Sequence, residues 1–243
     1  MRACTVVAAG LAACAVARAG ESVVALLAGV AANARFPVPT RADVRLERHR
    51  GDQTAAGAAV VIGRGQTLYV ETRDGTRALV RPSKIVVRAG ARVVRATPGA
   101  RLGDTDILLE DLVPVTPTLL KVPQVSDEGP TGTVVTGAPA FPSVRALIVL
   151  TIDPASHVVT RAKYYEKTIS DLAAFRRDDD FVDVAGHQRP TRIAVDRTRD
   201  ETSTHAELSW RPAPDAPAAL FTLAGLRAPS SVMPGGPPAA PRP

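Results

Sequence analysis

Alternating apolar and polar residues run through the second half of this chain and predict antiparallel strands. In residues 158–166 one set of alternate positions is mainly apolar and the other carries basic residues, which is the two-residue period of a half-buried strand. Residues 190–196 and 202–210 repeat this pattern, and the turn at 185–188 predicts a hairpin. Together these segments predict a sheet that has one apolar face.

The first half of the chain predicts one helix followed by a meander of strands. Apolar residues recur near helical spacing between Glu21 and Arg35, and two prolines then end the pattern. Asp74 and Gly75 form a typical hairpin turn. Strand patterns occupy residues 42–50, 58–63, 66–72, 78–82, 84–90 and 144–153. We expect roughly nine to eleven strands in all, with a second short helix as an option.

Two stretches in the middle of the chain lack a regular pattern. Residues 91–114 contain Pro98 and Gly103 and end in an apolar run, which predicts a flap over an apolar surface. Residues 116–141 are dense in proline and glycine, so we expect loops there around a single strand at 131–137.

The N-terminal segment predicts export. A short apolar run ends in an A-x-A site at Ala19, so residues 1–19 read as a secretory signal peptide. The string at 11–14 also fits a lipobox, in which Cys14 would be acylated and would anchor the protein. Cleavage after Ala19 is the favoured alternative, and both place the protein in the periplasm. Cleavage after Ala19 would remove both cysteines of the chain and so exclude disulfides and thiolate chemistry.

Composition and charge set the domain boundaries and argue against nucleic acid as a partner. After removal of the signal, residues 20–227 are the size of one β-rich domain. Residues 228–243 are mostly Pro, Ala, Gly and Ser, which predicts a disordered tail. Removal of the signal, with Arg2 and Arg18, lowers the formal net charge from +6 to +4 (28 basic minus 24 acidic residues), which is modest for this length, so we expect no nucleic-acid binding.

The sequence offers no catalytic or metal-binding constellation. Hydrolase elbows, phosphate-binding loops and zinc spacings are missing after residue 19, so we predict no catalytic residue, no metal site, no cofactor and no enzymatic activity. The four histidines are widely separated, which favours solvated surface positions. The acidic run at 178–180 could bind a cation, but a charged strand edge that resists edge pairing is the favoured interpretation.

Several local strings, in order, resemble the LolA-like outer-membrane lipoprotein-sorting proteins. The most specific is at residues 102–112, which is similar to the family's L-G-[ST]-D-F-S-Y-E-D-L segment. Residues 74–82 resemble its D-G-x-x-L-W-x-x-x-P strand entry. Similar strings at 162–166, 186–193 and 220–222 extend the resemblance over most of residues 70–225.

This resemblance implies an α+β fold of mostly antiparallel β structure. The expected shape is a strongly bent, incomplete barrel, a half-barrel, whose concave apolar face is covered by the N-terminal helix and the flap. Family members receive acyl chains in this cavity, and an arginine holds the lid closed. Arg64 is the nearest position here for that lid contact. Our candidate cavity residues are Leu79, Val86, Leu109, Leu112, Ile148, Leu150, Tyr164, Leu208 and Trp210.

The resemblance further implies a monomeric periplasmic carrier for the acyl chains of lipoproteins or of a similar lipid. Such a carrier takes cargo from an inner-membrane transporter and passes it to an outer-membrane acceptor. The alternative is an envelope sensor of the same fold, which would capture a membrane-anchored partner and bind acyl chains weakly. The aromatic content is only 4%, which predicts a smaller or more weakly binding pocket.

Overall fold

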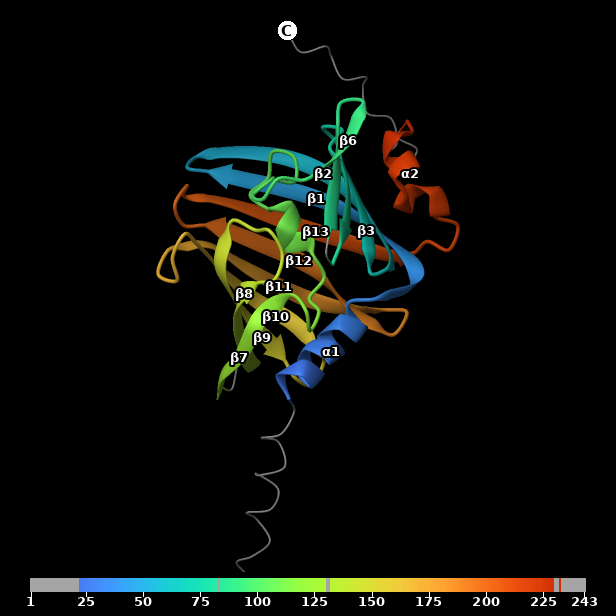
Figure 1. Ribbon diagram of the computed structural model, residues 1–243. Coiled ribbons are helices and arrows are strands. Elements are labelled where there is room, and N and C mark those ends of the chain that lie inside the picture. The colour runs from blue at the N-terminus through green and yellow to red at the C-terminus, as the bar shows by residue number, and fades with distance from the viewer. Residues whose placement is uncertain (1–21, 83, 130–131, 230–231, 233–243) are drawn as a thin grey trace, which may run out of the picture.

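The computed structural model describes residues 22–82, 84–129, 132–229 and 232. Its described strands form one 13-stranded antiparallel sheet in the order β6-β5-β4-β3-β2-β1-β13-β12-β11-β10-β9-β8-β7, which curls without closing (Figure 1). This confirms the predicted half-barrel. The strands are β1 (Phe36–Arg50), β2 (Gln53–Gly65), β3 (Thr67–Thr72), β4 (Arg77–Arg81), β5 (Lys84–Ala89), β6 (Arg92–Arg95), β7 (Leu120–Gly129), β8 (Gly132–Pro139), β9 (Arg145–Asp153), β10 (Val158–Glu166), β11 (Leu172–Val184), β12 (His187–Arg197) and β13 (Thr202–Pro212).

The predicted N-terminal helix is present as α1 (Val23–Asn33). The Ser22 hydroxyl caps it by accepting a hydrogen bond of 3.1 Å from the amide of Ala25, which satisfies one of the free N–H groups at the helix start. Its buried residues, which include Leu27 and Val30, join the core on the concave face of the sheet. The predicted signal peptide at 1–19 lies outside the described residues.

The predicted flap crosses the concave face between β6 and β7 (Figure 1). It contains a short 3-10 helix, η1 (Leu109–Leu112). Leu102, Ile107 and Leu109 are buried against the sheet and belong to the same core as α1. The apolar run that predicted this flap therefore packs onto the concave face, as expected.

A C-terminal segment covers the opposite face of strands β2 to β5. It consists of η2 (Ala218–Phe221) and α2 (Leu223–Arg227), which is the second short helix that the sequence left open. The second core cluster lies under this segment and contains Val60, Ile62, Tyr69, Leu79, Val86, Leu220, Leu226 and Val232. The Ala228 carbonyl accepts a hydrogen bond from Arg77, so packed chain continues beyond residue 227.

The structure corrects the prediction of loops at 116–141, because β7 occupies residues 120–129. This strand lies at the edge of the sheet, where a proline such as Pro123 is tolerated since one side needs no ladder hydrogen bond. The pairing with β8 is also irregular between Lys121 and Gln124, and Val122 has a φ of 43°. These features gave the segment the sequence character of a loop.

The acidic run at 178–180 lies within β11, where Asp178 and Asp179 pair with β12. The pairing of β11 with β10 ends at Arg177, so among the described residues the run has no strand partner on that side, in agreement with the predicted charged strand edge. The Asp178 carboxylate is buried and receives two hydrogen bonds from the Arg176 guanidinium, at 2.7 and 2.8 Å. No helix among the described residues is long and apolar enough to cross a membrane.

Candidate functional site

A cavity of about 230 Å³ lies between the concave face of the sheet, α1 and the flap. The sheet contributes residues from β9, β10, β12 and β13, and the flap contributes residues 110–115. Most of the lining side chains are aliphatic or aromatic. They include Val30, Leu68, Leu112, Val113, Phe141, Ile148, Leu150, Ala162, Tyr164, Ile193, Leu208 and Trp210.

Six of the nine candidate cavity residues line this space. Leu109 does not line it, but borders a neighbouring hollow and packs in the same core. The six lining residues are Leu112, Ile148, Leu150, Tyr164, Leu208 and Trp210.

Leu79 and Val86 do not line the cavity, because both lie in the core on the opposite face under α2. In β4, Ala78 and Val80 belong to the concave core, and Leu79 between them points the other way. Strands covered on both faces are apolar at every position, so their sequence does not reveal which alternate set faces inward.

Arg64, the predicted lid contact, lies outside the cavity and away from the flap. Its guanidinium carbon is 5.9 Å from the centroid of the Phe221 ring in η2. The side chain therefore contacts the C-terminal segment on the convex face, and the structure shows no contact between Arg64 and the flap among the described residues.

An aromatic corner closes one side of the cavity. The rings of Phe36 and Trp210 stack with centroids 6.0 Å apart, and the Trp210 indole donates a 2.8 Å hydrogen bond to the Pro190 carbonyl. Gly63 on β2 permits this arrangement, since a Cβ there would lie 2.3 Å from the Phe36 ring. On the Phe36 ring lies the guanidinium of Arg189, 4.3 Å from its centroid.

Arg189 joins β12 to the C-terminal end of α1. Its Nη1 donates to the carbonyls of Asn33, at 2.7 Å, and Gln188, at 3.1 Å, and its Nη2 donates to the Arg35 carbonyl. A cation at a helix C-terminus is favourable because the free carbonyls carry negative partial charge. Burial lowers the pKa of Arg189 to about 10, so the side chain is still charged at neutral pH. It lines the cavity and is 5% exposed.

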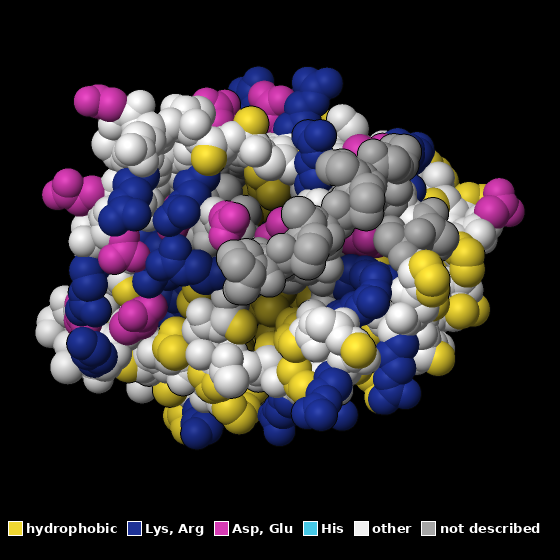
Figure 2. Space-filling view, turned by 90° about the horizontal axis from the view of Figure 1, so that it is seen from above, with side chains coloured by type: hydrophobic (Ala, Val, Ile, Leu, Met, Phe, Trp, Pro, Cys, Tyr) yellow, Lys and Arg dark blue, Asp and Glu magenta, His cyan; other side chains and the backbone are white. Residues whose placement is uncertain are grey.

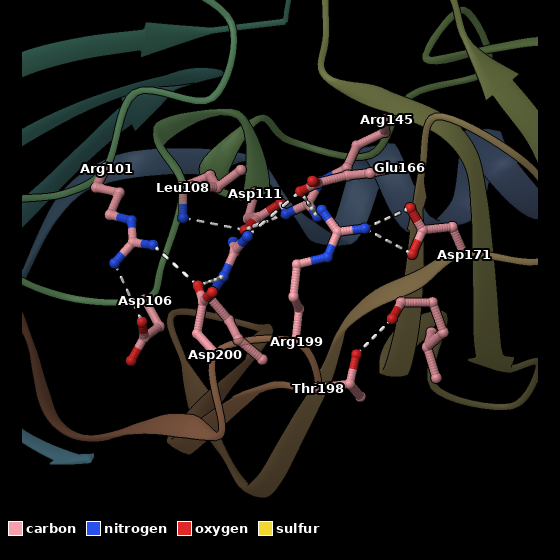
Figure 3. A network of polar contacts seen from close by, with 12 residues as sticks. Arg101, Asp106, Leu108, Asp111, Arg145, Glu166, Asp171, Thr198, Arg199 and Asp200 are labelled. Atoms are coloured by element: carbon pink, nitrogen blue, oxygen red, sulfur yellow. Dashed lines mark hydrogen bonds and ion pairs between the residues drawn. The ribbon is translucent and has the colours of Figure 1, made fainter.

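The flap is held to the sheet through Asp111 and Arg145, at the start of β9 (Figure 3). Arg145 Nη2 donates to both Asp111 carboxylate oxygens, at 3.1 and 3.2 Å, and its Nη1 donates to Glu166 on β10 at 3.1 Å. The same guanidinium lies 4.5 Å from the Tyr164 ring centroid in the cavity wall. Burial raises the pKa of the Tyr164 hydroxyl, which therefore stays neutral.

Two more ionisable side chains, Arg176 and Glu110, lie at this end of the cavity. Arg176 Nη1 donates a hydrogen bond of 2.7 Å to the Asp111 backbone carbonyl. Burial acts to lower the pKa of Arg176, but the Asp178 carboxylate outweighs it and the net direction is upward. Glu110 is 8% exposed, and neither carboxylate oxygen meets hydrogen-bond geometry, the nearest cation being Arg145 at 3.6 Å. Burial, reinforced by Asp111, raises the pKa of Glu110.

A second carboxylate, Asp106, anchors the start of the flap. It is fully buried and accepts hydrogen bonds from the hydroxyls of Thr202, at 2.9 Å, and Thr204, at 3.1 Å, both on β13. Arg48 on β1 reaches the same carboxylate at 3.2 Å. Arg101 reaches it at 3.4 Å (Figure 3). The flap is therefore fixed at two points, one over β1 and β13 and the other over β9 to β11.

Sequence reasoning identified the string at 102–112 but named only its leucines as candidate residues. The structure shows that Asp106, Glu110 and Asp111 are the groups that fix its position. Acidic residues within an otherwise apolar flap were the available signal. Arg145 and Arg189 had no such signal. The Asp111 carboxylate that binds Arg145 is 34 positions away, and the carbonyls of Asn33 and Arg35 that bind Arg189 are 156 and 154 positions away.

Charged side chains on the upper face of the molecule are mixed in sign. Figure 2 shows Lys and Arg side chains around the rim of this face with Asp and Glu among them, and apolar side chains towards its centre. The net charge of +6 is therefore not gathered into a single patch on this face.

The open antiparallel half-barrel encloses an apolar cavity under a helix and a flap, and concave apolar spaces of this kind are where ligands bind, although a fold does not by itself define a function. No protein-family model and no curated protein matches the sequence. Solved structures do match. One is a domain described as an outer-membrane lipoprotein-sorting protein from Vibrio parahaemolyticus, with a TM-score of 0.68 and 13% identity over 81% of this chain and 94% of that chain.

Two further solved structures share the fold. A DUF1329 family protein from Desulfovibrio piger has a TM-score of 0.66 at 19% identity, over 82% of this chain and 96% of its own. A LolA superfamily protein from Nitrosomonas europaea has a TM-score of 0.65 at 18% identity, over 83% and 98%. The chain therefore has the LolA-like fold that its sequence strings predicted.

Proposed function

We propose that this protein is a periplasmic carrier that binds the acyl chains of lipoproteins, or of a similar lipid, in outer-membrane lipoprotein sorting. The observation that carries the proposal is the apolar cavity under α1 and the flap. The fold shared with a lipoprotein-sorting domain supports it. Holding an acyl chain requires apolar surface and a removable cover, and it requires no catalytic group, metal or cofactor.

The size of the cavity limits the cargo to a single chain in this closed arrangement. Its volume of about 230 Å³ lies just below the roughly 300–1,000 Å³ of pockets that hold drug-sized ligands. Each buried methylene contributes ~0.8 kcal/mol, so a chain with ten buried methylenes gains about 8 kcal/mol. That gain corresponds to a dissociation constant on the order of 1 µM, and a lipid with several chains would require the flap or α1 to move.

Trp210 provides a direct test, because it is the single tryptophan of the chain and lines the cavity. A bromine-labelled C12 acyl chain that enters the cavity should quench Trp210 fluorescence with a saturable, micromolar titration. The variant Ala162→Leu places three extra carbons in the cavity wall and should weaken this quenching at least tenfold.

The matched control is Ala89→Leu, which makes the same substitution at an exposed position of β5. It should bind like the unchanged protein. Saturable quenching that is equal in both variants would place the chain elsewhere on the surface. An absence of quenching in the unchanged protein, at acyl-chain concentrations up to the onset of micelles, would refute the carrier proposal.

The cellular part of the proposal rests on the N-terminal sequence. The carrier would act as a monomer, take cargo from an inner-membrane transporter and deliver it to an outer-membrane acceptor. Labelling of growing cells with an alkyne fatty acid distinguishes the two export alternatives. Label on the mature protein shows acylation at Cys14, and an unlabelled protein whose N-terminus is Gly20 shows cleavage after Ala19.

A further inference from the structure

The cavity wall contains one buried cation without a matching carboxylate. Arg189 is 5% exposed, and no ion pair joins it to a carboxylate of the described residues. Asp183 acts on it electrostatically without forming an ion pair. Two other arginines at the cavity are matched: Arg145 by Asp111 and Glu166, and Arg176 by Asp178. A buried charge that lacks a counter-ion is costly, because carbonyl dipoles replace only part of its hydration.

The guanidinium of Arg189 also has donors to spare. A guanidinium carries five N–H bonds, and the three hydrogen bonds of Arg189 all go to backbone carbonyls. Its Nε is buried and has no partner among the described residues. Two N–H bonds therefore remain for a further acceptor, one of them on Nε.

The position of Arg189 relates these donors to the proposed ligand. The side chain lies at the aromatic corner, against Phe36 and one residue from Pro190, which accepts the Trp210 indole hydrogen bond. All four residues line the same apolar cavity. A head group at Arg189 would thus be continuous with the acyl chain in the rest of the cavity.

We propose that Arg189 forms a head-group subsite for an anion, so that the preferred ligand of this cavity is a single-chain amphiphile with a carboxylate head, a fatty-acid-like lipid. This inference rests on the proposed function, because it assumes that the cavity holds the acyl chain. Within that function it selects the similar lipid, because acyl chains attached to a lipoprotein are ester- or amide-linked and carry no free carboxylate. A planar carboxylate can accept from two guanidinium N–H bonds at once, and such charge-assisted pairs are strongest where water is excluded. The same subsite disfavours cationic amphiphiles.

The test compares ligands of one chain length on the unchanged protein. Dodecanoate, dodecanol and dodecyl phosphate are titrated below their micelle-forming concentrations at pH 8, where the carboxyl group is ionised, and binding is followed by Trp210 fluorescence. Because the chain is constant, its contribution cancels between ligands. Dodecanoate should bind at least ~tenfold more tightly than dodecanol. If dodecyl phosphate binds more tightly than dodecanoate, the anion subsite stands, but its preferred head group is a phosphate and the assignment to a carboxylate is wrong.

Two variants assign the preference to Arg189. Arg189→Lys keeps the charge but removes the planar fork and the Nε donor, so the ratio of dodecanol to dodecanoate dissociation constants should fall severalfold. This ratio is insensitive to a general loss of folded protein. The matched control is Arg192→Gln on the same strand, whose side chain is 68% exposed and pairs with Asp180. It should leave the ratio unchanged.

The outcomes separate this inference from the proposed function. Equal affinities for dodecanoate and dodecanol in the unchanged protein would overturn the head-group subsite and leave acyl-chain binding intact. A ratio that Arg189→Lys leaves unchanged would also overturn it, because the anion preference would then come from another group. Failure of all three ligands to bind would refute the carrier proposal itself.

Discussion

Replacing Asp106 by asparagine tests how the flap is held closed. Asparagine has nearly the same size as aspartate, so the substitution removes the negative charge without leaving a cavity. In the protein this carboxylate is fully buried and accepts from the hydroxyls of Thr202 and Thr204 and from the guanidinium groups of Arg48 and Arg101. The variant keeps one oxygen but puts an N–H₂ group where the second acceptor was.

The expected cost follows from these contacts. Weakening the charge-assisted hydrogen bonds to the threonine hydroxyls costs about 1.5–3 kcal/mol. The arginine side chains are 25% and 37% exposed, so each ion pair adds only about 0–1 kcal/mol. We therefore expect a loss of about 2–4 kcal/mol in the free energy of unfolding. For a domain of this size that loss lowers the melting temperature by roughly 4–16 °C.

Chemical denaturation and amide hydrogen exchange measure this loss globally and locally. The Leu102 amide donates to the Ile107 carbonyl at 2.9 Å, and the Leu109 amide donates to Ala100 at 2.8 Å. Exchange at these two flap amides should accelerate more than exchange in the central strands, because the anchor acts on the flap.

The control is Asp200→Asn. Asp200 is 40% exposed and pairs with Arg101 and Arg197 at 3.3 and 3.2 Å, so we expect a loss below about 1 kcal/mol. If Asp106→Asn unfolds within 0.5 kcal/mol of the unchanged protein and its flap amides keep their protection, the anchoring role assigned to Asp106 is wrong.

Three further substitutions test separate parts of the structure. Burial raises the pKa of Glu110, so ionisation of this side chain destabilises the folded protein as pH rises above about 4.5, the ordinary value. The stability of Glu110→Gln should therefore increase, relative to that of the unchanged protein, between pH 4 and pH 8. Denaturation midpoints that show a relative loss over this range would contradict this. Gly29→Ala places a Cβ 2.4 Å from the His157 ring. It should lower the melting temperature, although alanine has a helix propensity better than that of glycine by about 1 kcal/mol. A higher melting temperature would show that the His157 ring can move aside without cost. Arg64→Ala removes a contact with Phe221 on the convex face, so it should cost under about 1 kcal/mol and leave acyl-chain quenching of Trp210 unchanged; weaker quenching would restore its role as a lid contact.

The sequence predicted the parts of the fold that depend on local pattern. The helix before Pro37, the hairpin turn at Gly186 and the apolar flap each carry their signal within about ten residues, and all are present. The edge strand β7 was missed because a proline and an irregular pairing disguise it. Local pattern cannot report that an edge position tolerates both.

The candidate site was predicted most directly where one face of a strand is polar. On β10 and β13 the alternation identified Tyr164, Leu208 and Trp210 as residues of the apolar face, and they line the cavity. On β4 and β5 both faces are covered, so Leu79 and Val86 looked equivalent to their neighbours but lie on the convex side. Which side chains of β4 and β5 face the C-terminal segment depends on packing between residues far apart in the sequence, and a local pattern does not report such packing.

The proposed function requires that the cavity under α1 and the flap holds an acyl chain. The most direct measurement is quantitative lipid extraction and mass spectrometry of the exported protein, purified without detergent, beside Ala162→Leu prepared in the same way. We predict about one acyl chain for each molecule of the unchanged protein and a clear loss in the variant, whose cavity is partly filled. Protein that carries no lipid and takes none up from added acyl chains would contradict the account.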